Sequence, residues 1–244
     1  MTNSFLKNNL PPVYLITDRR LSGLSHAAQV AQFVAGGATL VQLREKHLPA
    51  KEFYREAVEA IKIAHNNNVK ILINDRVDIA LAARAGGAHL GQDDLPVAEA
   101  RKILGENAII GFSTHSIEQA VAARDLPLDY IAVGPIFATA TKENPDPTVG
   151  LDGLRAIRAA VKNVPLVAIG GITQENLVSV LNAGADSVAL IGALFKDANR
   201  IGETVKDLFQ TAYRRLPDGC SDGILPSALT NTKAGFNKNQ SNNR

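Results

Sequence analysis

The sequence predicts an α/β fold, a single (β/α)8 TIM barrel in which helices surround eight parallel strands. Short apolar runs recur eight times along the chain, with segments of helical character between them. A parallel connection needs a crossover long enough to hold a helix, so this alternation favours consecutive βα units. The length of 244 residues is typical of one barrel, and a hydrophobic fraction of 45% is sufficient for its core.

The eight runs are rich in Val, Ile, Leu and Ala, as expected for strands that are buried on both faces. In chain order they are Val13–Thr17, Thr39–Leu43, Lys70–Ile73, Ala88–Gly91, Ala108–Phe112, Tyr130–Val133, Leu166–Ile169 and Ser187–Ile191. Between the second and third, residues 50–66 carry apolar side chains at helical spacing opposite a charged face, which predicts a covering helix. A further helix is expected to begin near Thr173.

Glycine-alanine pairs precede three of the predicted strands and form a weak internal repeat. Gly37, Gly87 and Gly184 are expected to end the helices before those strands. Such pairs also occur in open doubly wound sheets, which are the alternative fold. The barrel is favoured because eight strands are predicted and no Gly-x-Gly-x-x-Gly motif follows the first.

The two ends of the chain are expected to lie outside the barrel. Residues 1–12 are predicted to be flexible, residues 13–216 to form the catalytic domain, and residues 217–244 to form a disordered tail. The tail is rich in Gly, Ser, Asn and Lys and has only scattered apolar residues.

Composition excludes several classes of function. The formal net charge is +2 with nearly balanced acids and bases, so a broad nucleic-acid-binding face is not expected. The only cysteine, Cys220, excludes an internal disulfide framework and a cysteine-rich metal site, which fits a cytoplasmic location. Neither secretion nor membrane spanning is expected, because the sequence shows no charged-then-apolar leader pattern and no run of about 18 apolar residues.

Polar residues cluster where the predicted strands end, which is where a barrel enzyme has its active site. After the second strand, alternation places Gln42, Arg44 and Lys46 on one face, opposite Leu43 and Glu45. Two cations on one face are suited to an anionic ligand. Ion pairing of both cations with neighbouring carboxylates is the alternative.

Carboxylates follow the third and fourth strands. Asn74 and Asp75 end one, and Asp94 follows the other, so the two carboxylates could converge at the barrel mouth. Oxygen ligands suit Mg²⁺, which commonly uses one or two protein carboxylates together with substrate phosphate and water. Each aspartate taken alone could instead be a helix cap.

Ser113 and His115 follow the fifth strand. A hydrolase is not favoured, because no Gly-x-Ser-x-Gly elbow surrounds the serine. Ser113 is interpreted as a donor to a phosphate oxygen, and His115 as a helix cap or a group at the edge of the substrate. The other histidines have no spacing typical of a metal cluster and are expected to be structural or exposed.

The segment from Gly134 to Lys142 changes abruptly from apolar to polar. Thr139, Thr141 and Lys142 would supply hydrogen-bond donors and one positive charge to an anion, although the segment alone could be an ordinary solvated loop. Small residues, among them Gly171 and Gly192, follow the last two strands and would let backbone N–H groups approach a second phosphate.

These motifs together resemble the thiamine phosphate synthase family, from about Val13 to Tyr213. The matching stretches, in order, are Gln42–Lys46, Asn74–Arg76, His89–Asp94, Gly111–His115, Gly134–Lys142 and Ile169–Ile172. The resemblance implies that Gln42, Leu43, Arg44, Glu45, Lys46, Asn74, Ser113 and Lys142 hold a pyrimidine diphosphate. It implies that Asp75 and Asp94 hold Mg²⁺, and that Thr139, Ala140, Thr141, Gly171, Ile191 and Gly192 hold a thiazole phosphate.

By the same resemblance, the enzyme condenses a hydroxymethylpyrimidine diphosphate with a thiazole phosphate, or with its carboxylate, to give thiamine phosphate and diphosphate. Lys142, Arg44, Lys46 and Ser113 would be catalytic, and no protein nucleophile would be needed. Family members often have serine where this chain has Gly192. The alternatives are a thiazole tautomerase of the same family and a catalytically silent binding protein. A homo-oligomer is compatible with the sequence, and no nucleic-acid or membrane partner is expected.

Overall fold

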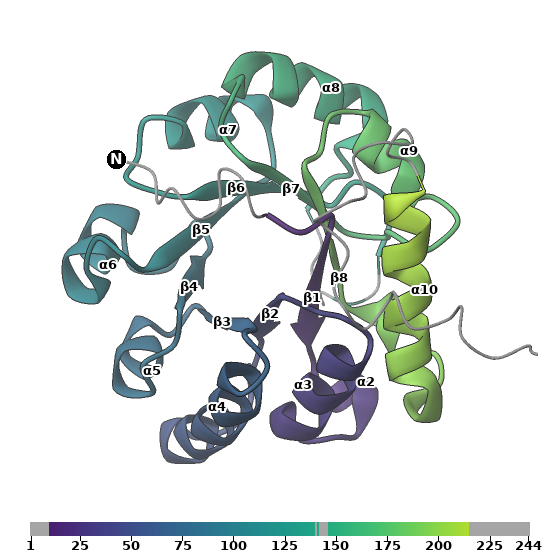
Figure 1. Ribbon diagram of the computed structural model, residues 1–244. Helices are drawn as coiled ribbons and strands as arrows, with labels where there is room; N and C mark the ends of the chain where they lie inside the picture. Colours follow the sequence, from purple (N-terminus) through teal and green to yellow (C-terminus); the bar gives the residue numbers. More distant parts are fainter. Residues whose placement is uncertain (1–9, 140, 142–145, 215–244) are drawn as a thin grey trace, which may run out of the picture.

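The computed structural model describes residues 10–139, 141 and 146–214, which form a closed barrel (Figure 1). Each strand pairs in parallel with the next, and β8 pairs with β1, so the predicted TIM barrel is confirmed. The strands are β1 (Val13–Thr17), β2 (Leu40–Leu43), β3 (Lys70–Asn74), β4 (Gly87–Leu90), β5 (Ile109–Thr114), β6 (Tyr130–Val133), β7 (Leu166–Ile169) and β8 (Ser187–Leu190).

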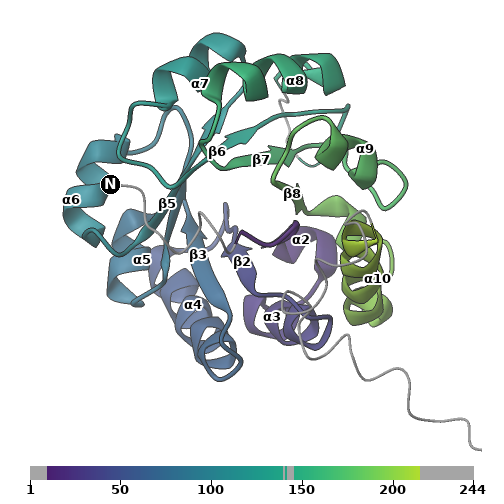
Figure 2. The ribbon, with the colours of Figure 1, turned by 45° about the horizontal axis from the view of Figure 1, so that its top comes forward.

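Helices lie around the outside of the strands, as Figure 2 shows from a second direction. They are α2 (Arg19–Ser22), α3 (His26–Ala35), α4 (Ala50–His65), α5 (Val77–Ala82), α6 (Val97–Leu104), α7 (Ile117–Ala123), α8 (Gly150–Val161), α9 (Leu177–Asn182) and α10 (Ile201–Tyr213). Two short 3-10 helices, η1 (Gly192–Leu194) and η2 (Ala198–Arg200), follow β8. Among the described residues, none of the helices has both the length and the apolar character needed to cross a membrane.

Strand alternation divides the apolar residues into two cores. The larger core lies between the strands and the surrounding helices and includes Leu43, Phe53 and Phe209. The smaller core fills the barrel, and its buried members are Tyr14, Ile16, Leu40, Leu72, Ile109, Tyr130, Ala132, Val167 and Ala189. The two tyrosines carry hydroxyl groups into this otherwise apolar interior, and each hydroxyl must find a hydrogen-bond partner there.

Two local expectations are corrected by the structure. Gly87 does not end a helix, because it is the first residue of β4, and a Cβ there would lie 1.8 Å from the Ile109 carbonyl oxygen. Arg84 adopts the left-handed conformation after α5 instead, with φ of 55°. The helix expected near Thr173 begins at Leu177, because Asn176 Oδ1 accepts a hydrogen bond from Thr173 N at 2.8 Å and holds a turn.

Two arginines join helices to the segments that precede strands. Arg101 donates to Asp129 at 2.7 Å, and Arg158 donates to Asp186 across the same sequence separation of 28 residues. Each aspartate also accepts a hydrogen bond from the backbone N–H of a strand residue. The repeated arrangement ties helix α6 to the start of β6, and α8 to the start of β8.

The packed part of the chain includes three residues before β1. Leu10 contacts the interior core, Pro11 is buried, and the Pro12 carbonyl accepts a hydrogen bond from Val188 N at 3.0 Å. Residues 1–9 and the whole segment expected to be a tail, 217–244, lie outside the described residues.

Candidate active site

Polar side chains gather at the carboxyl ends of the strands, as the sequence pattern predicts. The predicted alternation after β2 is confirmed for Gln42, which is buried within the barrel, and Leu43, which packs in the outer core. The pairing of both cations, weighed above as the alternative, is present. Arg44 Nη1 donates to Asp18 Oδ2 at 2.6 Å, and Lys46 Nζ is paired with Asp75 Oδ2.

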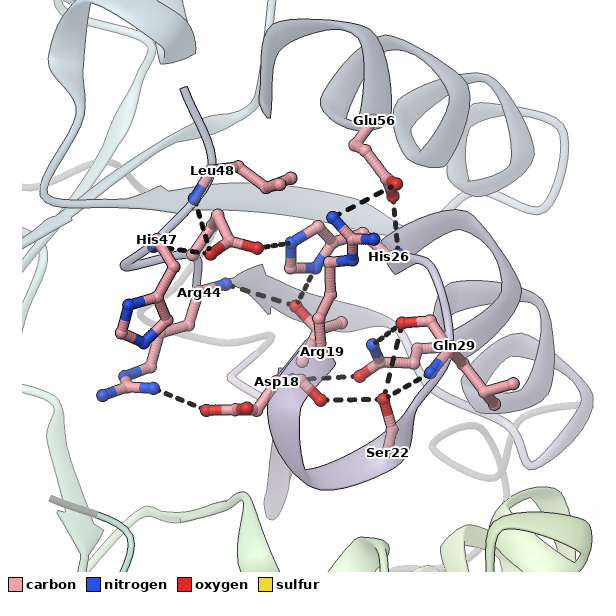
Figure 3. A network of polar contacts seen from close by, with 12 residues as sticks. Asp18, Arg19, Ser22, His26, Gln29, Arg44, His47, Leu48 and Glu56 are labelled. Atoms are coloured by element: carbon pink, nitrogen blue, oxygen red, sulfur yellow. Dashed lines mark hydrogen bonds and ion pairs between the residues drawn. The ribbon is translucent and has the colours of Figure 1, made fainter. Parts of the chain in front are cut away.

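The carboxylate that meets Arg44 comes from the end of β1. Asp18 also caps helix α2, because its Oδ1 accepts from Leu21 N at 3.1 Å. In Figure 3 the Arg44 guanidinium lies beside the carboxylate of this aspartate, and a dashed line joins the two groups. The guanidinium is therefore held in place by a carboxylate that is itself fixed by a helix N-terminus.

Glu45 faces away from Arg44 and holds the loop after β2. Its carboxylate accepts from the backbone N–H of His47 and Leu48, at 2.8 and 3.2 Å, and contacts His26 Nε2 at 3.3 Å. Burial opposes ionisation, but these hydrogen bonds and the nearby imidazole outweigh it and hold the pKa of Glu45 below its ordinary value. The side chains of Leu43 and Glu45 are thus occupied in packing and loop structure, unlike those of Arg44 and Lys46.

Asp75 and Asp94 converge from the ends of β3 and β4. Burial, and then the charge of neighbouring Asp75, raise the pKa of Asp94 above its ordinary value. Asp75 has φ of 62°, a sparsely populated conformation for a residue other than glycine, and its N–H donates to the His89 carbonyl at 2.8 Å. A pair of carboxylates held together in this way has the donor chemistry of a hard-cation site.

Neither aspartate is a helix cap. The N-cap positions of α5 and α6 are Arg76 and Pro96, and Asp94 Oδ2 instead accepts from Gly91 N at 2.7 Å inside its own loop. Within the described part of the chain, no group of three or more His, Cys, Asp or Glu could hold a metal by itself. A cation bound at this pair would need further ligands from water or a substrate.

Ser113 is joined to Gln42 through side chains that the sequence analysis did not select. Its Oγ lies 2.8 Å from His89 Nε2, so its histidine partner is His89 and not His115. The link continues through Tyr130 and Tyr14 to Gln42 Nε2. The alternation of side chains along each strand could have identified these residues. Tyr14 and Tyr130 are polar residues in otherwise mainly apolar strands, at positions that alternation places inside the barrel.

His115 lies beside the loop after β6. Its Nδ1 is 2.6 Å from the Gly134 carbonyl oxygen and 3.5 Å from Asp146 Oδ2. The cap of α7 is Ser116, whose side chain accepts from Gln119 N, so His115 is not the helix cap considered above.

The loops after β6, β7 and β8 meet at the opposite side of the barrel mouth. A Cβ at Gly171, where φ is 64°, would lie 2.5 Å from the Ala138 carbonyl oxygen, and one at Gly192 would lie 3.2 Å from Thr141 Oγ1. Thr139 Oγ1 in turn accepts from Thr141 N at 3.3 Å. Gly192 opens η1, with Ile191 as its N-cap. The predicted residues Ala140 and Lys142 lie outside the described residues.

The packing of these loops therefore requires glycine at position 171. The left-handed backbone and the close Ala138 carbonyl both exclude a side chain there. Within the described residues, the N–H groups of Gly171 and Gly192 have no backbone acceptor. As far as the described residues are concerned, these two N–H groups could donate to an anionic ligand.

Comparisons with known proteins agree with this geometry. The family model for thiamine monophosphate synthase matches residues 13–194. The chain is 48% identical over 183 residues to a thiamine-phosphate synthase of Chloroflexus aurantiacus, which covers 75% of this chain and 84% of the relative. It is 46% identical over 186 residues to that of Clostridium novyi, covering 76% and 91%.

A solved structure gives the same result. A thiamine phosphate pyrophosphorylase from Pyrococcus furiosus superposes with a TM-score of 0.77 at 36% identity, covering 86% of this chain and 99% of that one. The matched region contains all eight strands and the convergent polar residues described above. This chain belongs to the thiamine monophosphate synthase family.

Proposed function

We propose that this protein is a transferase that condenses a hydroxymethylpyrimidine diphosphate with a thiazole phosphate and releases diphosphate. The observation that carries the proposal is the presence of two anion-compatible regions at one barrel mouth. The first contains Arg44, Lys46 and the aspartate pair on the β2–β4 side. The second contains Thr141 and the glycines on the β6–β8 side.

Mg²⁺ fits the first region by its donor set. Asp75 and Asp94 offer two carboxylates, and the substrate diphosphate and water would supply the remaining oxygen ligands. The charge of Asp75 raises the pKa of Asp94, which shows that the two carboxylates repel each other. Lys46 already pairs with Asp75, and a cation bound between the two carboxylates would relieve the repulsion further. When bound, Mg²⁺ would supply charge neutralisation for the leaving diphosphate.

The protein's own groups would act mainly by orientation and electrostatics. The bond between the pyrimidine methylene carbon and the diphosphate oxygen breaks, and the electron pair leaves with the diphosphate. The thiazole nitrogen then forms the new bond to that carbon. Arg44, Lys46 and Lys142 are proposed to stabilise the leaving anion, and Ser113 to donate a hydrogen bond to the pyrimidine substrate.

Roles for the remaining predicted residues follow their positions. Gln42 and Asn74 are buried at the strand ends and would contact the pyrimidine substrate. Backbone N–H groups at Gly171 and Gly192, with Thr139 and Thr141, would hold the thiazole phosphate. Four further residues would contact the substrates through backbone atoms: Leu43, Glu45, Ala140 and Ile191. For Leu43 and Glu45 this agrees with their side chains, which lie in the outer core and in the loop after β2.

A thiazole tautomerase is the less favoured function. A proton shift on a single phosphorylated ring has no need for the aspartate pair or for the cations beside it. The deciding experiment mixes purified protein with both substrates, with and without Mg²⁺, and measures thiamine phosphate. We expect synthesis that depends on the metal, whereas isomerisation of the thiazole phosphate without synthesis would refute the proposal.

A further inference from the structure

A continuous line of hydrogen-bonding side chains crosses the barrel interior beneath the proposed site. Gln42 Nε2 donates to Tyr14 OH at 2.8 Å, and Tyr14 OH lies 3.0 Å from Tyr130 OH. Tyr130 OH lies 2.8 Å from His89 Nδ1, and His89 Nε2 lies 2.8 Å from Ser113 Oγ. Both ends of this line are residues that the proposed function places against the pyrimidine substrate.

The strand register builds the line. His89, Gly111 and Tyr130 are direct neighbours on β4, β5 and β6. A Cβ at Gly111 would lie 2.0 Å from Tyr130 Cζ, so only glycine lets the tyrosine ring lie across β5 toward His89. The rings of His89 and Tyr130 then stack, with centroids 5.5 Å apart, and Tyr14 meets Tyr130 edge to face.

Each of the three side chains between Gln42 and Ser113 has one hydrogen that it can donate. A tyrosine hydroxyl has a single proton, and a neutral imidazole has one N–H and one acceptor nitrogen. We take the His89 ring as a neutral imidazole, because it is buried and both its nitrogens lie against hydroxyl groups, those of Tyr130 and Ser113. The line therefore satisfies every buried hydroxyl only if all its hydrogen bonds run in the same direction.

The orientation of the Gln42 amide selects that direction. Because Gln42 Nε2 donates to Tyr14, Tyr14 donates to Tyr130, Tyr130 donates to His89 Nδ1, and His89 Nε2–H donates to Ser113. Ser113 then accepts inside the line, and its own hydrogen remains for a ligand. If the amide were reversed, every bond would reverse, and Ser113 would present only lone pairs to an anion.

We propose that Tyr14, Tyr130 and His89 are positioning residues that act through Gln42 and Ser113. They make the Ser113 hydroxyl a donor toward the anionic pyrimidine substrate, and they keep Gln42 Oε1 as an acceptor for a donor group of that substrate. An aminopyrimidine, which has an N–H donor on its ring edge, fits the acceptor end. The inference rests on the proposed function for the identity of the ligand, but the direction of the line is a property of the free protein.

The first test is the tautomer of His89, measured without substrate. Long-range ¹⁵N–¹H correlation spectra of protein labelled at histidine distinguish protonated from unprotonated ring nitrogens, and His89→Gln assigns the signals. We expect Nε2 protonated and Nδ1 unprotonated at pH 7. Protonation at Nδ1 in the parent protein overturns the proposed direction.

The second test removes single hydroxyls. Tyr130→Phe takes away the donor that fixes Nδ1, so we expect a mixture of His89 tautomers and a KM for the pyrimidine diphosphate raised about tenfold. The KM for the thiazole phosphate should not change. Tyr14→Phe should keep the tautomer but also raise the pyrimidine KM, because the Gln42 amide loses its anchor. Tyr54→Phe, at an exposed tyrosine on α4, is the matched control.

The outcomes separate the two proposals. A protein that makes no thiamine phosphate but has the Nε2–H tautomer refutes the proposed function and leaves the directional line intact. Synthesis with an unchanged pyrimidine KM in folded Tyr130→Phe and Tyr14→Phe, checked by melting temperature, overturns the positioning role alone. If Tyr130→Phe does not fold, the parent tautomer and Tyr14→Phe still decide.

Discussion

Gly192→Ser should tighten binding of the thiazole phosphate. Gly192 is exposed at the start of η1, and its φ lies outside the left-handed region that would exclude a side chain. Among the residues that the structure describes, an added Cβ would have one close neighbour, Thr141 Oγ1 at 3.2 Å, which is the end of a rotatable side chain. A serine hydroxyl would therefore enter the proposed phosphate site after a shift of a few tenths of an ångström in that threonine.

The size of the gain follows from the charge of the ligand. A hydrogen bond to a charged group contributes about 1.5–3 kcal/mol, and each 1.4 kcal/mol corresponds to about tenfold in affinity. The displacement of Thr141 offsets part of this contribution. We expect the dissociation constant for the thiazole phosphate to fall about fivefold or more.

Calorimetric titration of the parent protein, Gly192→Ser and Gly192→Ala with the thiazole phosphate measures this change. The alanine variant adds the same Cβ without a hydroxyl, so it reports the steric cost alone and should bind no more tightly than the parent. The KM for the pyrimidine diphosphate should be equal in all three proteins. Weaker binding by the serine variant than by the alanine variant would show that no phosphate oxygen lies within reach of position 192.

Three further predictions concern the carboxylates, the buried histidine and the arginine links. Asp94→Asn should lower the rate of thiamine phosphate synthesis about a hundred- to thousandfold and weaken its dependence on Mg²⁺. Asp93→Asn, at the adjacent exposed aspartate, is the control and should change neither. Equal rates for Asp94→Asn and the parent protein would exclude a metal role for Asp94. Burial lowers the pKa of His89 to about 4, so as the pH falls the unfolded chain binds a proton at this residue before the folded protein does. The free energy of unfolding should therefore be at its full value above pH 6.5 and should fall by about 3 kcal/mol toward pH 4. Urea unfolding of His89→Asn should show a flatter pH dependence over that range, and an identical slope would contradict the shift. Arg101→Ala should lower the free energy of unfolding by about 3–5 kcal/mol, because it removes the guanidinium that neutralises the charge of buried Asp129. Arg158→Ala should lower it by less, because Asp186 is about half exposed, and similar losses for the two variants would contradict this difference.

The barrel and the location of its site could be predicted from the sequence. The apolar runs are local features, and a strand of four or five residues imposes its alternation wherever it lies in a sheet. Gln42 and Leu43 could thus be assigned to opposite faces before their surroundings were known. Asp75 and Asp94 could likewise be placed at one rim, because parallel strands bring their carboxyl ends together.

Only the tertiary structure decided which of these groups meet. Arg44 pairs with Asp18 across 26 positions, and Tyr14 meets Tyr130 across 116. Such contacts depend on barrel closure and on the stagger between strands, which no local pattern encodes. For the same reason the partner of Ser113 proved to be His89 on the neighbouring strand rather than His115, two residues along the chain.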